Sequence, residues 1–223
     1  MKRERIHWID IARGFFIIAI VLGHVLSNKE NIIHSWLFSF HVPAFFFLSG
    51  LCFSSNKDGF IPFLKKKLRT IVIPYALASL VSIVLFAIAA FIIPRINNFV
   101  DTPIQNLFAM VYSNSNAYSM KYNLPLWFLP CLFVTETGAY GICWIANKSK
   151  KGVLVYLATM VASVVLTVCL KAYLQWHIET ACAMMFWFVM GMALRRFNQA
   201  YQPQRKWALA AIALILVGGV QRY

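Results

Sequence analysis

Charged residues are scarce in this chain, and acidic residues are the scarcest. Lys and Arg number 21 and Asp and Glu only 7, so that the four types make up 13% of the 223 residues. A soluble domain carries about a quarter charged residues. Hydrophobic residues make up 61% and fall in long runs, which indicates an integral membrane protein. The net charge of +14 does not predict nucleic-acid binding, because the basic residues lie between apolar runs and form no contiguous basic domain.

Cysteine is infrequent and has no recognisable pattern. The five cysteines lie in or beside apolar runs, and none belongs to a CxxC pair. An odd number without paired spacing argues against a disulfide framework and against a zinc site. We therefore expect no bound metal or cofactor, and we interpret the cysteines as small apolar packing residues.

Long apolar runs predict an all-α fold, a polytopic transmembrane helical bundle that forms one membrane domain over residues 1–223. The N-terminal run lacks a convincing small-residue cleavage site, so we expect a retained first span. Pro43 is expected to interrupt the second span, and the segment 95–123 is expected to be a loop on the outer side. About seven spans are expected, at 8–27, 36–54, 71–93, 124–146, 152–171, 178–194 and 206–221.

Lysine and arginine are distributed unequally between the two sides of these spans. With the N-terminus inside, fifteen of them fall in inside segments and five in outside segments, while Arg13 lies within the first span. The positive-inside rule then predicts a cytoplasmic N-terminus. We expect a multi-pass protein of the plasma membrane.

The first predicted span, "WIDIARGFFIIAIVLGHV", carries three ionisable residues on one side. Eleven residues separate Arg13 from His24, which leaves an angular offset of about 20° on a helix. Asp10 precedes Arg13 by three residues and is its neighbour on the helix surface. A central charge facing lipid costs at least about 2.5–3.5 kcal/mol, so we expect this stripe to face the bundle interior. An interfacial Arg13 paired with Asp10, and a structural His24, are the alternatives.

Five stretches, taken in chain order, resemble the acyltransferase-3 family of integral membrane O-acyltransferases. Each stretch is a weak signature alone, but the five in order are specific. The fourth stretch, "LPLWFLPCLFVTE", is similar to the fucose 4-O-acetylase-like branch. Where that family often has two arginines three apart, this chain has Lys66 and Arg69. The family usually has about ten spans, so the chain is expected to be incomplete at its C-terminus. The stretches are "DIARGFFIIAIVLGH", "FHVPAFFFLSG", "KKKLRTIVIPY", "LPLWFLPCLFVTE" and "FWFVMGMALRR".

This resemblance implies transfer of an acyl group, often acetyl from acetyl-CoA, to a sugar hydroxyl of a surface polysaccharide or its lipid-linked precursor. His24 is then the catalytic candidate, as general base or transient acyl carrier, because histidine exchanges protons near neutral pH. Arg13 is the second catalytic candidate. Lys66 and Arg69 are expected to bind the phosphates of acyl-CoA at the inner surface. Positive-inside topology or lipid headgroup binding are alternative explanations of the same basic run.

Four further residues are candidates for substrate binding, namely Asp10, His41, Glu136 and Trp127. Glu136, if buried in the fourth span, needs a proton or a basic partner, for which Arg13 and His24 are the candidates. His41 and Glu136 serve equally well as packing residues, and Trp127 suits either an aromatic belt or sugar stacking. A transporter without acyl chemistry and an inactive remnant remain alternative functions, because intramembrane Arg, His and Glu also suit proton-coupled transport.

Overall fold

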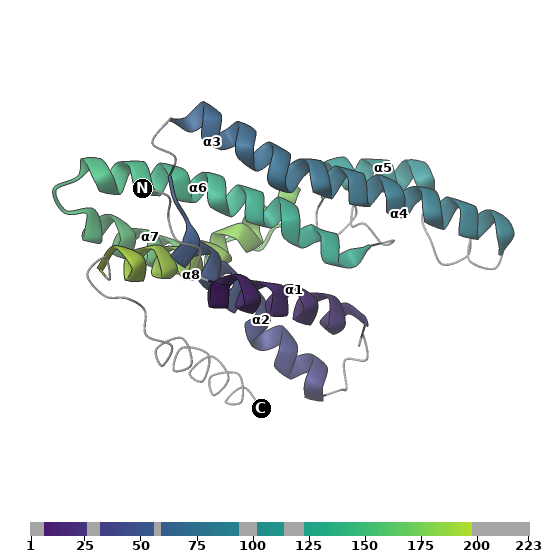
Figure 1. Cartoon of the computed structure of the whole chain (residues 1–223), viewed down its shortest axis with the longest axis horizontal. Helices are drawn as coiled ribbons and strands as arrows, with labels where there is room; N and C mark the ends of the chain where they lie inside the picture. The colour runs from purple at the N-terminus through teal and green to yellow at the C-terminus, as the bar shows by residue number, and fades with distance from the viewer. Residues whose placement is uncertain (1–6, 26–31, 56–58, 94–101, 114–122, 198–223) are drawn as a thin grey trace. The chain divides into compact units, whose positions relative to one another are not determined.

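A computed structural model describes five ranges of the chain, all of them mainly helical and without β-strands: residues 7–25, 32–55, 59–93, 102–113 and 123–197 (Figure 1). Within these ranges, four helices are long and apolar enough to cross a membrane: Phe60–Ile92, Pro125–Lys148, Gly152–Cys169 and Gln175–Arg196. The prediction of an all-α membrane bundle is therefore confirmed. The seventh predicted span, 206–221, lies outside the described residues.

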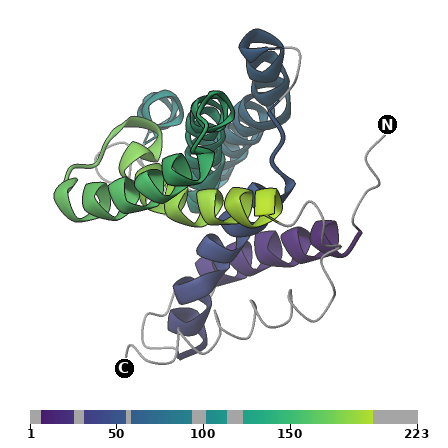
Figure 2. The same cartoon turned by 90° about the vertical axis from the view of Figure 1, so that its left-hand side faces the viewer.

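Two compact units make up the chain, and each is described by itself. The first unit comprises Met1–Phe53 with Phe186–Tyr223, and the second comprises Ser54–Met185. In the first unit, helix α1 (His7–Val25) packs against helix α2 (Ile32–Cys52), as Figure 2 shows from a second direction.

Helix α2 runs through Pro43 without ending there. The predicted interruption at this residue is therefore wrong. A proline removes one backbone hydrogen bond, but membrane helices tolerate this where neighbouring groups satisfy the freed carbonyl. The T-shaped contact of Phe16 with Phe40, whose ring centroids lie 6.3 Å apart, joins α1 to the half of α2 before this proline.

Glycines allow α2 to approach helix α8 (Ile178–Phe197) closely within the first unit. A Cβ atom added to Gly50 would lie 2.0 Å from the carbonyl oxygen of Phe188, and one added to Gly191 would lie 2.2 Å from that of Phe47. Small residues permit such backbone contact between membrane helices. Gly50 and Gly191 therefore let the two helices meet backbone to backbone.

The second unit begins with one continuous helical rod (Figure 1). It consists of α3 (Phe60–Lys67), the π-helical segment η1 (Leu68–Val72) and α4 (Ile73–Ile92). The predicted third span began at residue 71, so the structure extends it towards the N-terminus. The basic residues 65–69 consequently lie on a helix and not in a loop. Pro74 does not break the rod, although it lies two residues after the π-helical segment; membrane helices tolerate a proline where neighbouring groups satisfy the freed carbonyl.

Helix α5 (Pro103–Tyr112) lies within the segment 95–123 that was predicted to be a loop. Thr102 and Gln105 form a capping box at its N-terminus, and Pro103 occupies its first turn. The helix packs beside α4, where the Tyr75 hydroxyl donates to the carbonyl of Met110 at 2.7 Å (Figure 1). The sequence "TPIQ" carries this capping signal, so the helix could have been predicted.

The rest of the second unit is an antiparallel arrangement of membrane helices. A short 3₁₀ segment η3 (Leu124–Trp127) leads into α6 (Phe128–Lys148), which packs against α7 (Gly152–Cys169). A second 3₁₀ segment, η4 (Gln175–His177), then leads into α8, whose residues 178–185 belong to this unit and whose later residues belong to the first. The Ser163 hydroxyl of α7 donates to the Cys182 carbonyl of α8, which joins these two helices near the start of α8.

Candidate functional site

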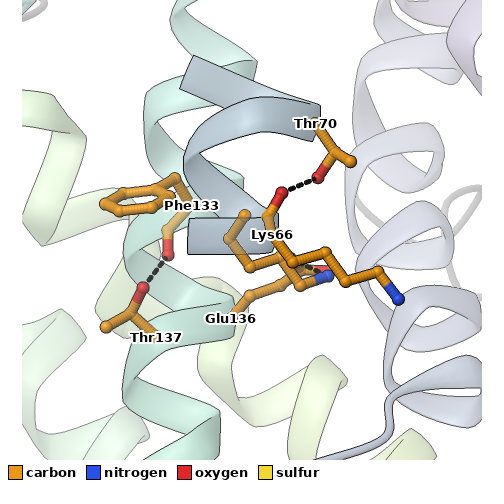
Figure 3. Close-up of polar contacts among 6 residues, drawn as sticks. Lys66, Thr70, Phe133, Glu136 and Thr137 are labelled. Carbon is orange, nitrogen blue, oxygen red and sulfur yellow. Dashed lines mark hydrogen bonds and ion pairs between the residues drawn. The ribbon is translucent and has the colours of Figure 1, made fainter. Parts of the chain in front are cut away.

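An ion pair between Lys67 and Glu136 joins the helical rod to α6. The Lys67 ammonium lies 2.6 Å from Oε2 of Glu136, and the two side chains are 20% and 7% exposed. Figure 3 shows Glu136 beside the end of α3. No hydrogen bond of good angle reaches Oε2 from the described residues, so the contact is an electrostatic pair and not an aligned hydrogen bond. Sequence alone suggested Arg13 or His24 as the partner of Glu136; the cation that the structure places against this carboxylate is Lys67.

The threonine hydroxyls on either side of Glu136 are bonded elsewhere, and Lys67 is the cation that faces this carboxylate. The hydroxyl of Thr135 donates to the carbonyl of Cys131 on its own helix. The hydroxyl of Thr137 likewise donates to the carbonyl of Phe133 (Figure 3). Neither hydroxyl proton is therefore directed at Glu136. A buried carboxylate on a membrane-span helix is costly unless a cation compensates it, and Lys67 supplies that cation.

Three exposed cations surround Lys67 along the rod, and we name Lys65, Lys66 and Arg69 the basic surface. Lys66 and Arg69 are three residues apart, close enough on a helix to contact one anion together. The π-helical segment begins directly after Lys67 and contains Arg69. Such π-helical insertions are frequent at functional sites. The Thr70 hydroxyl donates to the Lys66 carbonyl at 2.9 Å and satisfies one backbone group there (Figure 3).

Trp127 lies in a second cluster, where α6 and α8 begin. Its ring centroid is 5.3 Å from that of His177, which is buried. Oε1 of Glu179 lies 3.7 Å from Nδ1 of His177, and Oε2 of Glu179 accepts a hydrogen bond from the backbone N–H of Leu174 at 3.0 Å. We name Trp127, His177 and Glu179 the His177 cluster. No group of three or more His, Cys, Asp or Glu side chains that could hold a metal ion occurs in the described part of the chain.

The remaining predicted site residues belong to the first unit. The guanidinium carbon of Arg13 lies 5.3 Å from the ring centroid of Phe45 on α2, and its Nε is buried without a hydrogen bond among the described residues. Asp10 is exposed, and the described ranges contain no ion pair between it and Arg13. His41 is buried in α2. His24 lies near the end of α1, but its side chain is outside the described residues.

The predicted residues thus form two groups, one in each unit. Asp10, Arg13, His24 and His41 lie in the first unit, and Lys66, Arg69, Trp127 and Glu136 lie in the second.

Comparison with protein-family models gives a match to the acyltransferase-3 model, which is described as an acyltransferase domain. The match covers residues 6–220 of the chain.

The chain belongs to the acyltransferase-3 family.

Comparison with curated proteins and with solved structures found no significant match. The family match covers the residues of both units, including the polar stripe of α1, the basic surface and the Lys67–Glu136 pair. In this acyltransferase, the spans therefore carry several ionisable side chains of the kind that in membrane proteins mark functional sites.

Removal of Glu136 from this acyltransferase is expected to destabilise it strongly. Glu136→Leu leaves the ammonium of Lys67 without its counter-charge in a mostly buried place, which costs about 3–5 kcal/mol. The double variant Glu136→Leu with Lys67→Met replaces both charges with apolar groups and is expected to recover most of this loss. Thermal unfolding of the detergent-solubilised protein measures both effects. A double variant as unstable as Glu136→Leu alone would contradict the pairing.

Sequence reasoning overlooked Lys67 and His177 as individual site residues. Lys67 was one of several similar cations in a basic run, and a run of this kind does not reveal which member faces a buried acid. His177 lies near a span end and was given no role. The local signal was the spacing of His177 and Glu179, two ionisable residues two positions apart at the start of an apolar span.

Proposed function

We propose that this acyltransferase moves an acetyl group from acetyl-CoA to a sugar hydroxyl of a cell-surface polysaccharide or its lipid-linked precursor. The observation that carries the proposal is the family match over residues 6–220 on a chain with an exposed basic surface beside a largely buried ion pair. The sequence likeness of residues 124–136 supports the fucose 4-O-acetylase-like branch. The protein is proposed to lie in the plasma membrane with its N-terminus in the cytoplasm.

The roles follow from the chemistry of the reaction. A sugar hydroxyl attacks a thioester only when a base removes its proton, and His24 is the proposed base or transient acyl carrier. Arg13 is proposed to act beside it. Asp10, His41, Glu136 and Trp127 are proposed to bind the substrates. The phosphates of acetyl-CoA need cations, and the basic surface offers Lys66 and Arg69 on one side of a helix.

Transfer of labelled acetyl tests the proposed reaction directly. The purified protein in lipid nanodiscs is incubated with acetyl-CoA labelled in its acetyl group and with surface polysaccharide from cells that lack the gene. Label in the polysaccharide supports the enzyme. Movement of polysaccharide or acetyl-CoA across vesicle membranes without any labelled product supports a transporter. The observation that favours a transporter is the largely buried Lys67–Glu136 pair between two membrane-span helices.

The double variant Lys66→Gln with Arg69→Gln is expected to raise the KM for acetyl-CoA. Each charge-assisted hydrogen bond to a phosphate contributes about 1.5–3 kcal/mol, so the loss of one corresponds to roughly ten- to a hundredfold. Lys150→Gln with Lys151→Gln is the matched control, because these cations are exposed on the turn between α6 and α7. An equal rise of KM in both variants would show that general positive charge, and not the basic surface, attracts acetyl-CoA.

A further inference from the structure

Helix α5 has its polar and apolar sides reversed relative to a surface helix of a soluble protein. Asn106 and Ala109 on one side of the helix, and Ser113 at its end, are buried. The exposed side is mainly apolar, and no residue from 102 to 113 is charged. A surface helix in water has its polar residues outside and its apolar residues towards the core. The exposed apolar side chains, which we name the exposed face of α5, are Ile104, Leu107, Phe108 and Val111.

Contacts with α4 place α5 beside the middle of a membrane span and not beyond its end (Figure 1). The Tyr75 hydroxyl donates to the Met110 carbonyl at 2.7 Å, and Ala109 packs in one buried apolar cluster with Ile83. Tyr75 and Ile83 precede Ile92, the last residue of α4, by about 26 and 14 Å along the helix axis. Because α4 belongs to a rod that is long and apolar enough to cross a membrane, α5 lies at the depth of its apolar part.

The C-terminal end of α5 is hydrogen-bonded to protein groups. A helix leaves its last four carbonyls without partners in the helix, and at the surface of a soluble protein water can bind them. The Met110 carbonyl accepts from the Tyr75 hydroxyl, and the Val111 carbonyl accepts from the indole N–H of Trp176 at 2.8 Å. The Ala109 carbonyl accepts from the backbone N–H that follows the helix. A helix end inside hydrocarbon requires such partners, because no water is present to replace them.

The length of α5 and the directions of its neighbours determine how the chain can pass through this region. The ten residues of α5 measure about 15 Å, half of the hydrocarbon thickness of about 30 Å, so α5 is too short to cross the membrane. The rod and α6 run antiparallel, because Lys67 lies against Glu136 while Ser82 accepts from the Asn123 amide at 3.0 Å. The end of α4 and the start of α6 therefore lie on the same side of the membrane.

We propose that α5 is a re-entrant helix within one leaflet of the bilayer and that its exposed face contacts lipid acyl chains. The C-terminal end of α5 is inserted most deeply, where Tyr75 and Trp176 bind its carbonyls. The neighbouring α4 also carries exposed apolar side chains, among them Leu77, Val81 and Val84, so the acyl chains that cover α4 reach α5 as well. This surface for lipid does not depend on the proposed acyl transfer.

A photoreactive lipid tests the contact in the unmodified full-length protein. The protein is placed in nanodiscs of a phosphatidylcholine that carries a diazirine in one acyl chain, irradiated, and analysed by mass spectrometry for residues that carry lipid. We expect adducts on the exposed face of α5, as on the exposed residues Val161 and Val164 of α7, and none on Lys150 and Lys151 in the exposed turn. Adducts on α7 without adducts on α5 would overturn the proposal, whether water or a second copy of the chain covers α5.

A charge on the exposed face of α5 distinguishes lipid from water by the direction of its effect. Phe108→Asp puts a carboxylate against acyl chains, so amide hydrogen exchange over residues 107–112 in nanodiscs is expected to accelerate roughly tenfold or more. Phe108→Leu is the matched control, because it keeps an apolar side chain at the same position, and it is expected to exchange at the wild-type rate. Slower or unchanged exchange in Phe108→Asp would show that this face meets water and would contradict the re-entrant helix.

Discussion

Replacing His24 with alanine is expected to abolish measurable acyl transfer while the protein still inserts into the membrane. His24 and Arg13 lie eleven residues apart on α1, on the same side of the helix within about 20°. A base or acyl carrier removed from a hydroxyl acylation lowers the rate by about 100- to 10,000-fold. Label transfer from acetyl-CoA to deacetylated polysaccharide measures this loss.

His34→Ala is the control for His24, because it removes a histidine to which no role is assigned. It is expected to transfer acetyl at the wild-type rate. Protease accessibility of the termini and elution from a sizing column show whether each variant is inserted and monodisperse. A wild-type rate in His24→Ala would exclude the residue from the mechanism, and the acyltransferase would then need another base.

Adding a single methyl group at Gly191 is expected to destabilise the first unit severely. The Cβ of Gly191→Ala would lie 2.2 Å from the carbonyl oxygen of Phe47 and 2.8 Å from the backbone nitrogen of Leu51. Backbone atoms cannot rotate away as a flexible side chain can, so α2 and α8 would have to separate. Overpacking costs about 1–3 kcal/mol and occasionally more, and we expect a value at or above the upper end.

Gly141→Ala is the matched control for this crossing. Gly141 lies in α6, and a Cβ atom there would meet no other atom within 4 Å. Its replacement is expected to be neutral or to stabilise the helix by up to about 1 kcal/mol. Gly50→Ala should lower the melting temperature as Gly191→Ala does, and the double variant should lose less than the sum, because both glycines serve one contact. A Gly191→Ala protein that melts like Gly141→Ala would refute the close crossing.

Local signals explain which parts of the fold were predictable from the amino-acid sequence. The spans 124–146, 152–171 and 178–194 correspond to α6, α7 and α8, because a lipid-exposed backbone must form its hydrogen bonds within the segment. Two errors arose where a local signal was misjudged. Pro43 predicts an interruption, but α2 continues through it. The polar segment 95–123 predicts a loop, but the capping box at Thr102 and Gln105 starts helix α5 there.

The candidate site was predictable only in part. Sequence spacing predicts that Asp10, Arg13 and His24 share one side of α1, because one helix determines the angle between its own residues. That they act as one site stays a prediction. For Glu136, the same reasoning offers Arg13 and His24 as partners, whereas the structure places Lys67 against it. Sequence spacing also gave no reason to connect Trp127 with His177, which lies fifty residues further along the chain at the start of another helix.

The amino-acid sequence by itself determined that this protein is a helical membrane protein of the acyltransferase-3 family, with polar residues gathered on its first span. Only the tertiary structure decided that Lys67 pairs with Glu136, that Gly50 meets α8 at Phe188, and that His177 lies beside Trp127. The physical reason is that hydropathy and helical periodicity are set by neighbouring residues. The crossing of two helices depends instead on how all their side chains pack together. This crossing determines which residues of one helix contact which residues of the other.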